Sequence, residues 1–397
     1  MWKIKNSQKL FYAAYFIYIA GMFMDVLPDI LYVDTEMLKK TFKMISMVLL
    51  VIRFCFFVLP RGFDLKNLIG KGILKYFTVQ KIFLVIIFSF TLLLGLMSKN
   101  FYLLALIMFG LNMQEFRMRE LFSVSFCILV FLTGMTILLC FLGGVPNIRL
   151  IRDTSYHYGK ARYTLGFVHS LVLPGILVYV AAYFYTIRKK VKVSDFIIFQ
   201  GLGILVFYLC DSRNGIIALE FLLWSLLVWQ LVMGKAYGKR KQILEKVLTI
   251  MASAAFLLIT IFSLFLLWGY SGQKQFAIIL NSVLSNRVML ALLNFDVLPF
   301  QMISVLSQQE FSDVTLHVFD NGYYYLLARY GYVVVGIFII TTIMTVAYMK
   351  KKENYYAMIT YIVIALLNFI DNGMVSYIFF PYMLCGIHSL YYSDEKS

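Results

Sequence analysis

Three arginines at separated points of the chain have the chemistry to bind phosphate. Arg162 lies in RYTLGFVHS together with His169, Arg213 lies in CDSRNG, and Arg287 lies in LSNRVMLALL. A planar guanidinium binds phosphate through two parallel hydrogen bonds. If the three arginines converge, they predict a cationic pocket that holds a diphosphate and stabilises the charge that develops as it leaves.

A fourth stretch, HVFDNGYYYLLARYG, adds groups for proton transfer. Asp320 and Asn321 precede a tyrosine-rich helix start, and Arg329 lies about two turns into that helix. An arginine below a membrane surface is costly and usually has a partner or a wet cavity. A carboxylate or a histidine beside the arginines could take a proton from an attacking hydroxyl. These stretches contain no HxxxH, DxD or cysteine cluster, so the sequence predicts no metal and no cofactor.

Each of these residues also has a structural explanation. Arg213 could be a snorkelling anchor in a turn between two helices, and Asp320 or Asn321 could cap a helix. His169 could form a hydrogen bond between helices. The tyrosines at 323–325 fit an interfacial aromatic belt.

The composition indicates which elements must position these residues. Hydrophobic residues make up 61% of the 397 residues and charged residues 14%, whereas soluble domains average roughly 45–50% and about 25%. The apolar runs are continuous rather than alternating, which excludes a β-barrel. We therefore expect an all-α polytopic membrane protein with one transmembrane domain, 1–397. The net charge of +16 lies in the connections between apolar runs, and it indicates topology signals rather than nucleic-acid binding.

Apolar runs of suitable length predict about twelve spans, near 10–27, 42–59, 80–97, 101–115, 121–144, 164–187, 195–211, 214–233, 247–269, 323–348, 355–370 and 374–391. Lysine and arginine concentrate in alternate connections, which places both termini in the cytoplasm. The outer face then carries two long loops, 145–163 and 270–322. Within the second, AIILNSVL and MLALLNF predict short helices that lie on or dip into the membrane surface.

The four stretches, between about 160 and 335, resemble the Wzy-type polymerases, which join lipid-linked repeat units of O-antigens and capsules and share a superfamily with O-antigen ligases. The likeness rests on Arg162, Gly166, Phe167 and His169, on Ser212-Arg213, on Arg287, and on Asp320-Asn321, Tyr324 and Tyr330-Gly331. Family members often continue the histidine with Pro-Asn, whereas this chain has Ser170-Leu171.

The resemblance implies a metal-independent glycosyltransferase with a GT-C-like fold in the bacterial inner (plasma) membrane. Its substrates would be polyprenyl (undecaprenyl) diphosphate-linked oligosaccharides, and its partners membrane lipids and a chain-length regulator of polysaccharide assembly. It assigns the diphosphate and leaving group to Arg162, Arg213 and Arg287. Asp320 is the first choice for the general base and His169 the second. The remaining substrate contacts fall to Asn321, Tyr324 and Arg329.

Other classes of function also fit the composition. A flippase for the same lipid-linked units would have a similar number of spans, but the sequence contains no internal repeat of the kind common in secondary transporters. A ligase would use the same donor with a different acceptor, and a membrane scaffold would need no site. The long 270–322 loop favours surface chemistry over alternating access.

Overall fold

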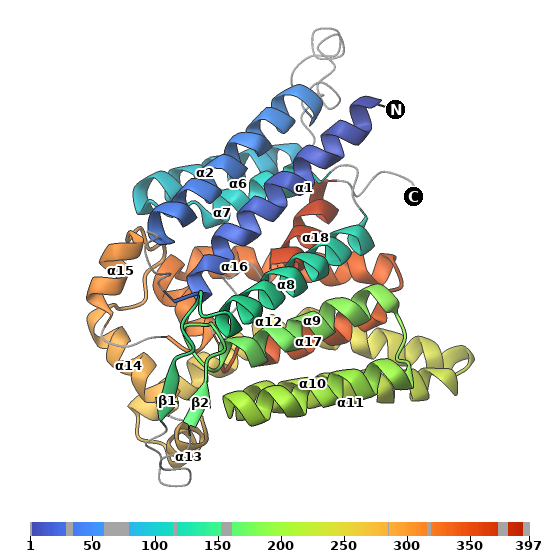
Figure 1. Cartoon of the computed structure of the whole chain (residues 1–397), viewed down its shortest axis with the longest axis vertical. Coiled ribbons are helices and arrows are strands. Elements are labelled where there is room, and N and C mark those ends of the chain that lie inside the picture. The colour runs from blue at the N-terminus through green and yellow to red at the C-terminus, as the bar shows by residue number, and fades with distance from the viewer. Residues whose placement is uncertain are drawn as a thin grey trace. The chain divides into compact units, whose positions relative to one another are not determined.

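The computed structural model describes residues 2–28, 35–58, 79–113, 117–151, 161–284, 286–315, 319–371 and 380–391. The described chain is almost wholly helical (Figure 1). The helices are α1 (Trp2–Phe23), α2 (Thr35–Arg53), α6 (Val79–Ser98), α7 (Tyr102–Leu111), α8 (Met118–Phe141), α9 (Val172–Arg188), α10 (Val193–Cys210), α11 (Arg213–Gly234), α12 (Gly238–Ser271), α13 (Gln275–Val283), α14 (Arg287–Val297), α15 (Gln308–Val314), α16 (Gly322–Lys351), α17 (Tyr355–Leu367) and α18 (Phe380–Tyr391). A 3₁₀ helix, η1 (Met24–Val26), extends α1, and a π-helix, η2 (Phe54–Val58), extends α2. Strands β1 (Arg149–Ile151) and β2 (Ala161–Tyr163) form one antiparallel pair.

Six described helices are long and apolar enough to cross a membrane: Ser7–Val26, Met118–Phe141, Val193–Cys210, Arg213–Gly234, Gly238–Ser271 and Gly322–Lys351. A seventh span is possible if the bent pair α13 and α14 counts as one. Several spans also present apolar side chains outward, as α10 does with Ile197, Ile204 and Tyr208. Such surfaces suit lipid rather than water. The chain has the features of a multi-pass membrane protein.

The prediction of twelve spans is wrong. At 1.5 Å per residue, the 10 residues of α7 reach only about 15 Å and the 13 residues of α17 about 20 Å, whereas the hydrocarbon core is ~30 Å thick. α2 begins with charged residues and is not among the candidate spans. α9 begins at Val172 rather than 164. The first part of the span near 374–391 and most of the 60–81 connection lie outside the described residues.

The contacts divide the chain into two compact units. Unit 1 comprises 1–49, 116–248 and 352–364, and unit 2 comprises 50–115, 249–351 and 365–397. In unit 1, polar pairs join the helices: the Tyr15 and Ser125 hydroxyls lie 2.8 Å apart, and Ser46 donates to the Ala14 carbonyl. Small residues allow close approach, because a Cβ on Gly215 of α11 would overlap Pro174 of α9. In a membrane the hydrophobic effect does not drive helices together, so they associate through small residues and hydrogen bonds between buried hydroxyls.

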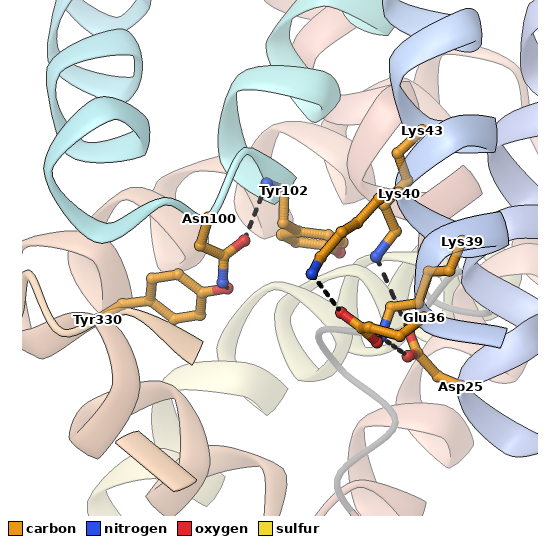
Figure 2. A network of polar contacts seen from close by, with 8 residues as sticks. All are labelled: Asp25, Glu36, Lys39, Lys40, Lys43, Asn100, Tyr102 and Tyr330. Atoms are coloured by element: carbon orange, nitrogen blue, oxygen red, sulfur yellow. Dashed lines mark hydrogen bonds and ion pairs between the residues drawn. The ribbon is translucent and has the colours of Figure 1, made fainter. Parts of the chain in front are cut away.

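A cluster of charges ties η1 to the first turns of α2 in unit 1 (Figure 2). Lys39 pairs with Asp25 and, at 3.3 Å, with Glu36. Burial lowers the pKa of the Lys39 ammonium, but the Asp25 and Glu36 carboxylates outweigh this effect and leave the pKa above its ordinary value. Burial raises the pKa of Glu36, yet Lys39 and Lys40 hold it below the usual 4.5.

Acid should loosen this cluster before the rest of unit 1. A carboxyl with a lowered folded pKa stabilises the fold above its unfolded value and loses that contribution as the pH falls through the folded value. The raised pKa of Lys39 also stabilises the fold, and that contribution is lost only as the pH rises above 10.5. We expect the α2 amides to lose hydrogen-exchange protection below about pH 4.5, after correction for intrinsic exchange. Glu36→Gln should remove part of this pH dependence; an unchanged pH profile would contradict the assignment.

In unit 2 the closest helix pairing joins α16 and α18 through Gly386. A Cβ at this position would overlap the Thr341 carbonyl oxygen and lie 2.6 Å from Oγ1 of Thr345. The Thr345 hydroxyl also bridges the two helices, because it lies 2.9 Å from the carbonyl oxygens of both Thr341 and Tyr382. Only glycine permits this distance between the two backbones.

Gly386→Ala is therefore expected to lower the thermal stability of the purified protein. Overpacking of this kind costs about 1–3 kcal/mol, because the nearest obstruction, the Thr341 carbonyl oxygen, is backbone and cannot rotate away. Gly336→Ala, on α16 itself, is the matched control, since nothing lies within 4 Å of its added methyl group. That control should be neutral or slightly stabilising. Equal melting temperatures for the two variants would contradict the packing argument.

Candidate functional site

The strongest pairing of predicted site residues joins Arg287 and Asp320 in unit 2. Nε of Arg287 donates to Oδ2 of Asp320 over 3.1 Å. The arginine side chain is 10% exposed and the aspartate side chain 43%. The two Nη groups of Arg287 have no hydrogen-bond partner among the described residues. The aspartate therefore orients the guanidinium and leaves its two amino groups available to a ligand.

A tight turn built by asparagines sets the position of Arg287. α13 and α14 meet at 108°, which confirms the two short helices predicted within the 270–322 loop. Asn286 adopts a left-handed conformation with φ 65° directly before Arg287, as asparagine does more readily than most residues. The buried Asn281 accepts from the Met289 amide at 3.0 Å and donates to Oδ1 of Asn286 at 3.1 Å.

Asn281→Ala should destabilise this turn and displace Arg287. The Met289 amide loses its acceptor, and a buried donor left unpaired costs about 1–3 kcal/mol. Melting of the purified variant measures the loss. Ser282→Ala is the matched control, because its exposed hydroxyl bonds only to the Ile279 carbonyl of its own helix. If Asn281→Ala and Ser282→Ala both have the melting temperature of the wild type, the turn does not depend on the Asn281 side chain.

Asp320 is held by the capped start of α16. Oδ1 of Asn321 accepts from the amides of Tyr323 and Tyr324 at 2.8 and 3.1 Å, which makes it a helix N-cap. The Tyr324 hydroxyl donates to the Ser263 carbonyl at 2.6 Å. Both side chains are buried, and Tyr324 belongs to an apolar cluster with Phe295 and Phe319. In this structure Asn321 and Tyr324, two predicted substrate contacts, thus fix the helix start that positions Asp320.

Arg162 and Arg213 lie in unit 1, around the turn between α10 and α11. Arg162 stands on β2 opposite Leu150. Its Nε lies 3.5 Å from Oδ2 of Asp211, whose side chain is 2% exposed. Asp211 ends α10 with φ 48°, and the next residue, Ser212, caps α11 by accepting from the Gly215 amide. Arg213 is the first residue of α11 and is exposed.

The sequence predicted that His169 lies within a span beginning near residue 164. In the structure α9 begins only at Val172, so His169 precedes the helix. Residues 164–171 form turns, with Leu165 and Gly166 at φ 52° and 90°. The backbone at Gly166 cannot be helical, and a Cβ there would lie 3.0–3.1 Å from Thr136 and Cys140 of α8. His169 is exposed, and its Nδ1 accepts from the Leu171 amide at 3.2 Å. Ring orientation is thus fixed locally, while the ring remains accessible.

The predicted residues form two separate sets, one in each unit. Unit 1 holds Arg162, Arg213 and His169, and unit 2 holds the Arg287–Asp320 pair and Arg329. The two sets have the same local arrangement. In each, an aspartate directly before a helix N-cap pairs with an arginine that is distant in sequence.

Asp211 was missed as a site residue by the sequence analysis. The signal was available in the sequence, since Asp211 precedes Ser212 just as Asp320 precedes Asn321.

The chemistry available at the Arg287–Asp320 pair is anion binding, because the Nη groups of Arg287 have no partner among the described residues. Among the described residues no group of three or more His, Cys, Asp or Glu side chains is placed to hold a metal ion. Arg329, the last predicted contact, is buried, and one of its amino groups bonds to the carbonyls of Leu306 and Ser307. Comparison with known proteins finds no match: no family model, no curated protein and no solved structure matches the chain.

Proposed function

We propose that this protein is a membrane glycosyltransferase that polymerises polyprenyl-diphosphate-linked oligosaccharide units. The observation that carries the proposal is the Arg287–Asp320 pair. Arg287 is oriented by a carboxylate through Nε and keeps both Nη groups available. A diphosphate at the membrane surface needs such a donor, and a carboxylate beside it can accept the proton of an attacking sugar hydroxyl.

The order of elements predicts which side of the membrane Arg213 and Arg287 each face. Two candidate spans, α11 and α12, separate Arg213 from the loop that carries Arg287. Two crossings return the chain to the side on which it began. The turn between them and the first residues of α12 are rich in lysine and arginine, with Lys235, Lys239, Arg240 and Lys241. By the positive-inside rule this turn is cytoplasmic, so Arg213 and Arg287 would both face outward. The resemblance to Wzy-type polymerases implies a GT-C-like fold in a bacterial plasma membrane, and the distribution of lysine and arginine predicts both termini inside.

A transporter of lipid-linked units is the second candidate, and one observation favours it. α16 is broken at Gly331, with φ 82° and ψ 178°. Discontinuous helices line the substrate sites of many secondary transporters. A polymerase and a flippase handle the same substrate, so their products must decide.

The test is reconstitution of the purified chain in lipid vesicles with one polyprenyl-diphosphate repeat unit and no nucleotide. The size of the products is then measured. A ladder of multiples supports the polymerase. Movement of the intact unit across the bilayer without a ladder contradicts it and indicates a flippase. If neither occurs, transfer to a different acceptor tests the ligase, which would use the same donor.

A further inference from the structure

The break in α16 is closed by a neighbouring segment of unit 2. Tyr332 and Val333 donate their amides to the carbonyls of Gln301 and Met302, at 3.1 and 3.0 Å. In return the Ser304 amide donates to the Tyr330 carbonyl at 3.2 Å. Gly331 is required because a Cβ would lie 2.7 Å from both carbonyl oxygens of the segment. The backbone groups freed by the break are thereby satisfied within the protein.

A side-chain contact further fixes the break. Nδ2 of Asn100 donates to the Tyr330 hydroxyl at 3.0 Å, and Oδ1 of Asn100 accepts from the Tyr102 amide at 3.1 Å (Figure 2). Tyr330 is buried. Three segments, 100–102, 301–304 and 330–333, thus hold each other around residue 331. The break is a built feature of the fold rather than a frayed helix.

Next to the break lies a buried arginine whose binding edge has no partner. Arg329 is 1% exposed. Its Nη1 donates to the carbonyls of Leu306 and Ser307, and its guanidinium lies 5.0 Å from the centre of the Phe311 ring. Nε and Nη2 have no hydrogen-bond partner among the described residues. These two nitrogens form one edge of the guanidinium, which is the edge that binds an oxyanion through two parallel bonds.

No acidic side chain of the described chain neutralises Arg329. The nearest candidate, Glu310, accepts from the Ser307 amide at 2.7 Å. That backbone bond, the bond to the Ser307 hydroxyl and more distant charges including Arg329 lower the pKa of Glu310, but its carboxylate does not reach ion-pair distance of Arg329. Arginine stays protonated even when buried. An uncompensated charge is costly in a protein interior and in a membrane.

A second buried side chain, that of Ser304, also has a polar group without a hydrogen-bond partner in the described part of the chain. Oγ of Ser304 is buried and has no hydrogen-bond partner among the described residues. Its backbone pairing with Tyr330 places Ser304 beside the residue that follows Arg329. Three donors, two of them on one charged guanidinium, therefore belong to the two segments that meet at the break, and no acceptor among the described residues is assigned to them. Buried polar groups in proteins nearly always have a partner.

We infer that Nε and Nη2 of Arg329, together with the Ser304 hydroxyl, form an oxyanion subsite for one phosphate or carboxylate group. This subsite is distinct from the Arg287–Asp320 pair and does not depend on the proposed function. Nη1 anchors the arginine to the backbone, so the binding edge is pre-oriented. The donors are covered by protein in this structure.

The test is a thermal melt of the full chain in nanodiscs of phosphatidylcholine, with inorganic phosphate titrated against chloride at constant ionic strength. Phosphate should raise the melting temperature of the wild type. Arg329→Lys keeps the charge and loses the two-nitrogen edge, so its apparent phosphate affinity should fall about tenfold. Ser304→Ala removes one donor and leaves the backbone anchor intact, so its apparent phosphate affinity should fall several-fold. Arg240→Lys, at an exposed arginine outside both sites, is the matched control and should respond like the wild type.

Nanodiscs doped with phosphatidylglycerol distinguish the two sources of the oxyanion. Stabilisation by inorganic phosphate supports a soluble group, and stabilisation by the anionic lipid alone supports a headgroup; either must depend on Arg329 and Ser304. The inference is overturned if neither probe stabilises the wild type, or if Arg329→Lys and Ser304→Ala respond like the wild type. If Arg329→Lys does not fold, Ser304→Ala decides. Because no glycosyl transfer is measured, failure here leaves the proposed polymerase untouched.

Discussion

Replacing Arg287 with lysine should reduce polymer formation by about 10²–10³-fold, the usual cost of losing one charge-stabilising donor in an active site. Lysine keeps the charge, but a single ammonium cannot bond to Asp320 and present two further amino groups to a diphosphate. The measurement is the initial rate of ladder formation in vesicles. Asp296→Asn, an exposed carboxylate on the same helix, is the matched control and should retain the wild-type rate.

Asp320→Asn separates two roles for the carboxylate. If Asp320 takes the proton from the attacking hydroxyl, the asparagine variant should lose activity by about 10²–10⁴-fold. If Asp320 only orients Arg287, the amide oxygen of asparagine still accepts from Nε, and much of the activity should survive. Wild-type ladders from both Arg287→Lys and Asp320→Asn would remove the pair from the catalytic site.

Arginines near helix starts could be found from the sequence because they interrupt apolar runs. Their partners were harder to find, since ion pairs such as Arg162–Asp211 join residues far apart in the chain. The apolar stretches AIILNSVL and MLALLNF also predicted the short helices α13 and α14. The sequence could not identify Asn281 as the residue that fixes their turn, because that role depends on the 108° bend.

The count of spans failed for a different physical reason. Apolar content shows which segments avoid water, but not whether a segment is continuous helix. Residues 164–171 are as apolar as a span, yet left-handed backbone at Leu165 and Gly166 delays the start of α9 to Val172. Buried short helices such as α7 are apolar because protein surrounds them. A hydropathy scale cannot separate burial in protein from burial in lipid.

The second large effect is expected on stability, at Asp211. Asp211→Asn should destabilise unit 1 by about 3 kcal/mol, the lower end for breaking a buried ion pair, because Arg162 keeps some exposure to water. Asparagine tolerates the left-handed backbone of residue 211, so the substitution removes the charge without adding strain. Asp211→Ala would combine both penalties and should melt lower still.

Thermal melts of the double variant test whether loss of the ion pair with Arg162 is the cause. Arg162→Met combined with Asp211→Asn removes both charges, so it should recover most of the stability lost by Asp211→Asn alone. Arg213→Met is the matched control: this exposed arginine lies two residues away, and its loss should leave the melting temperature nearly unchanged. If the double variant melts lower than Asp211→Asn, the two losses are independent, and the stabilising contacts of Asp211 lie elsewhere than on Arg162.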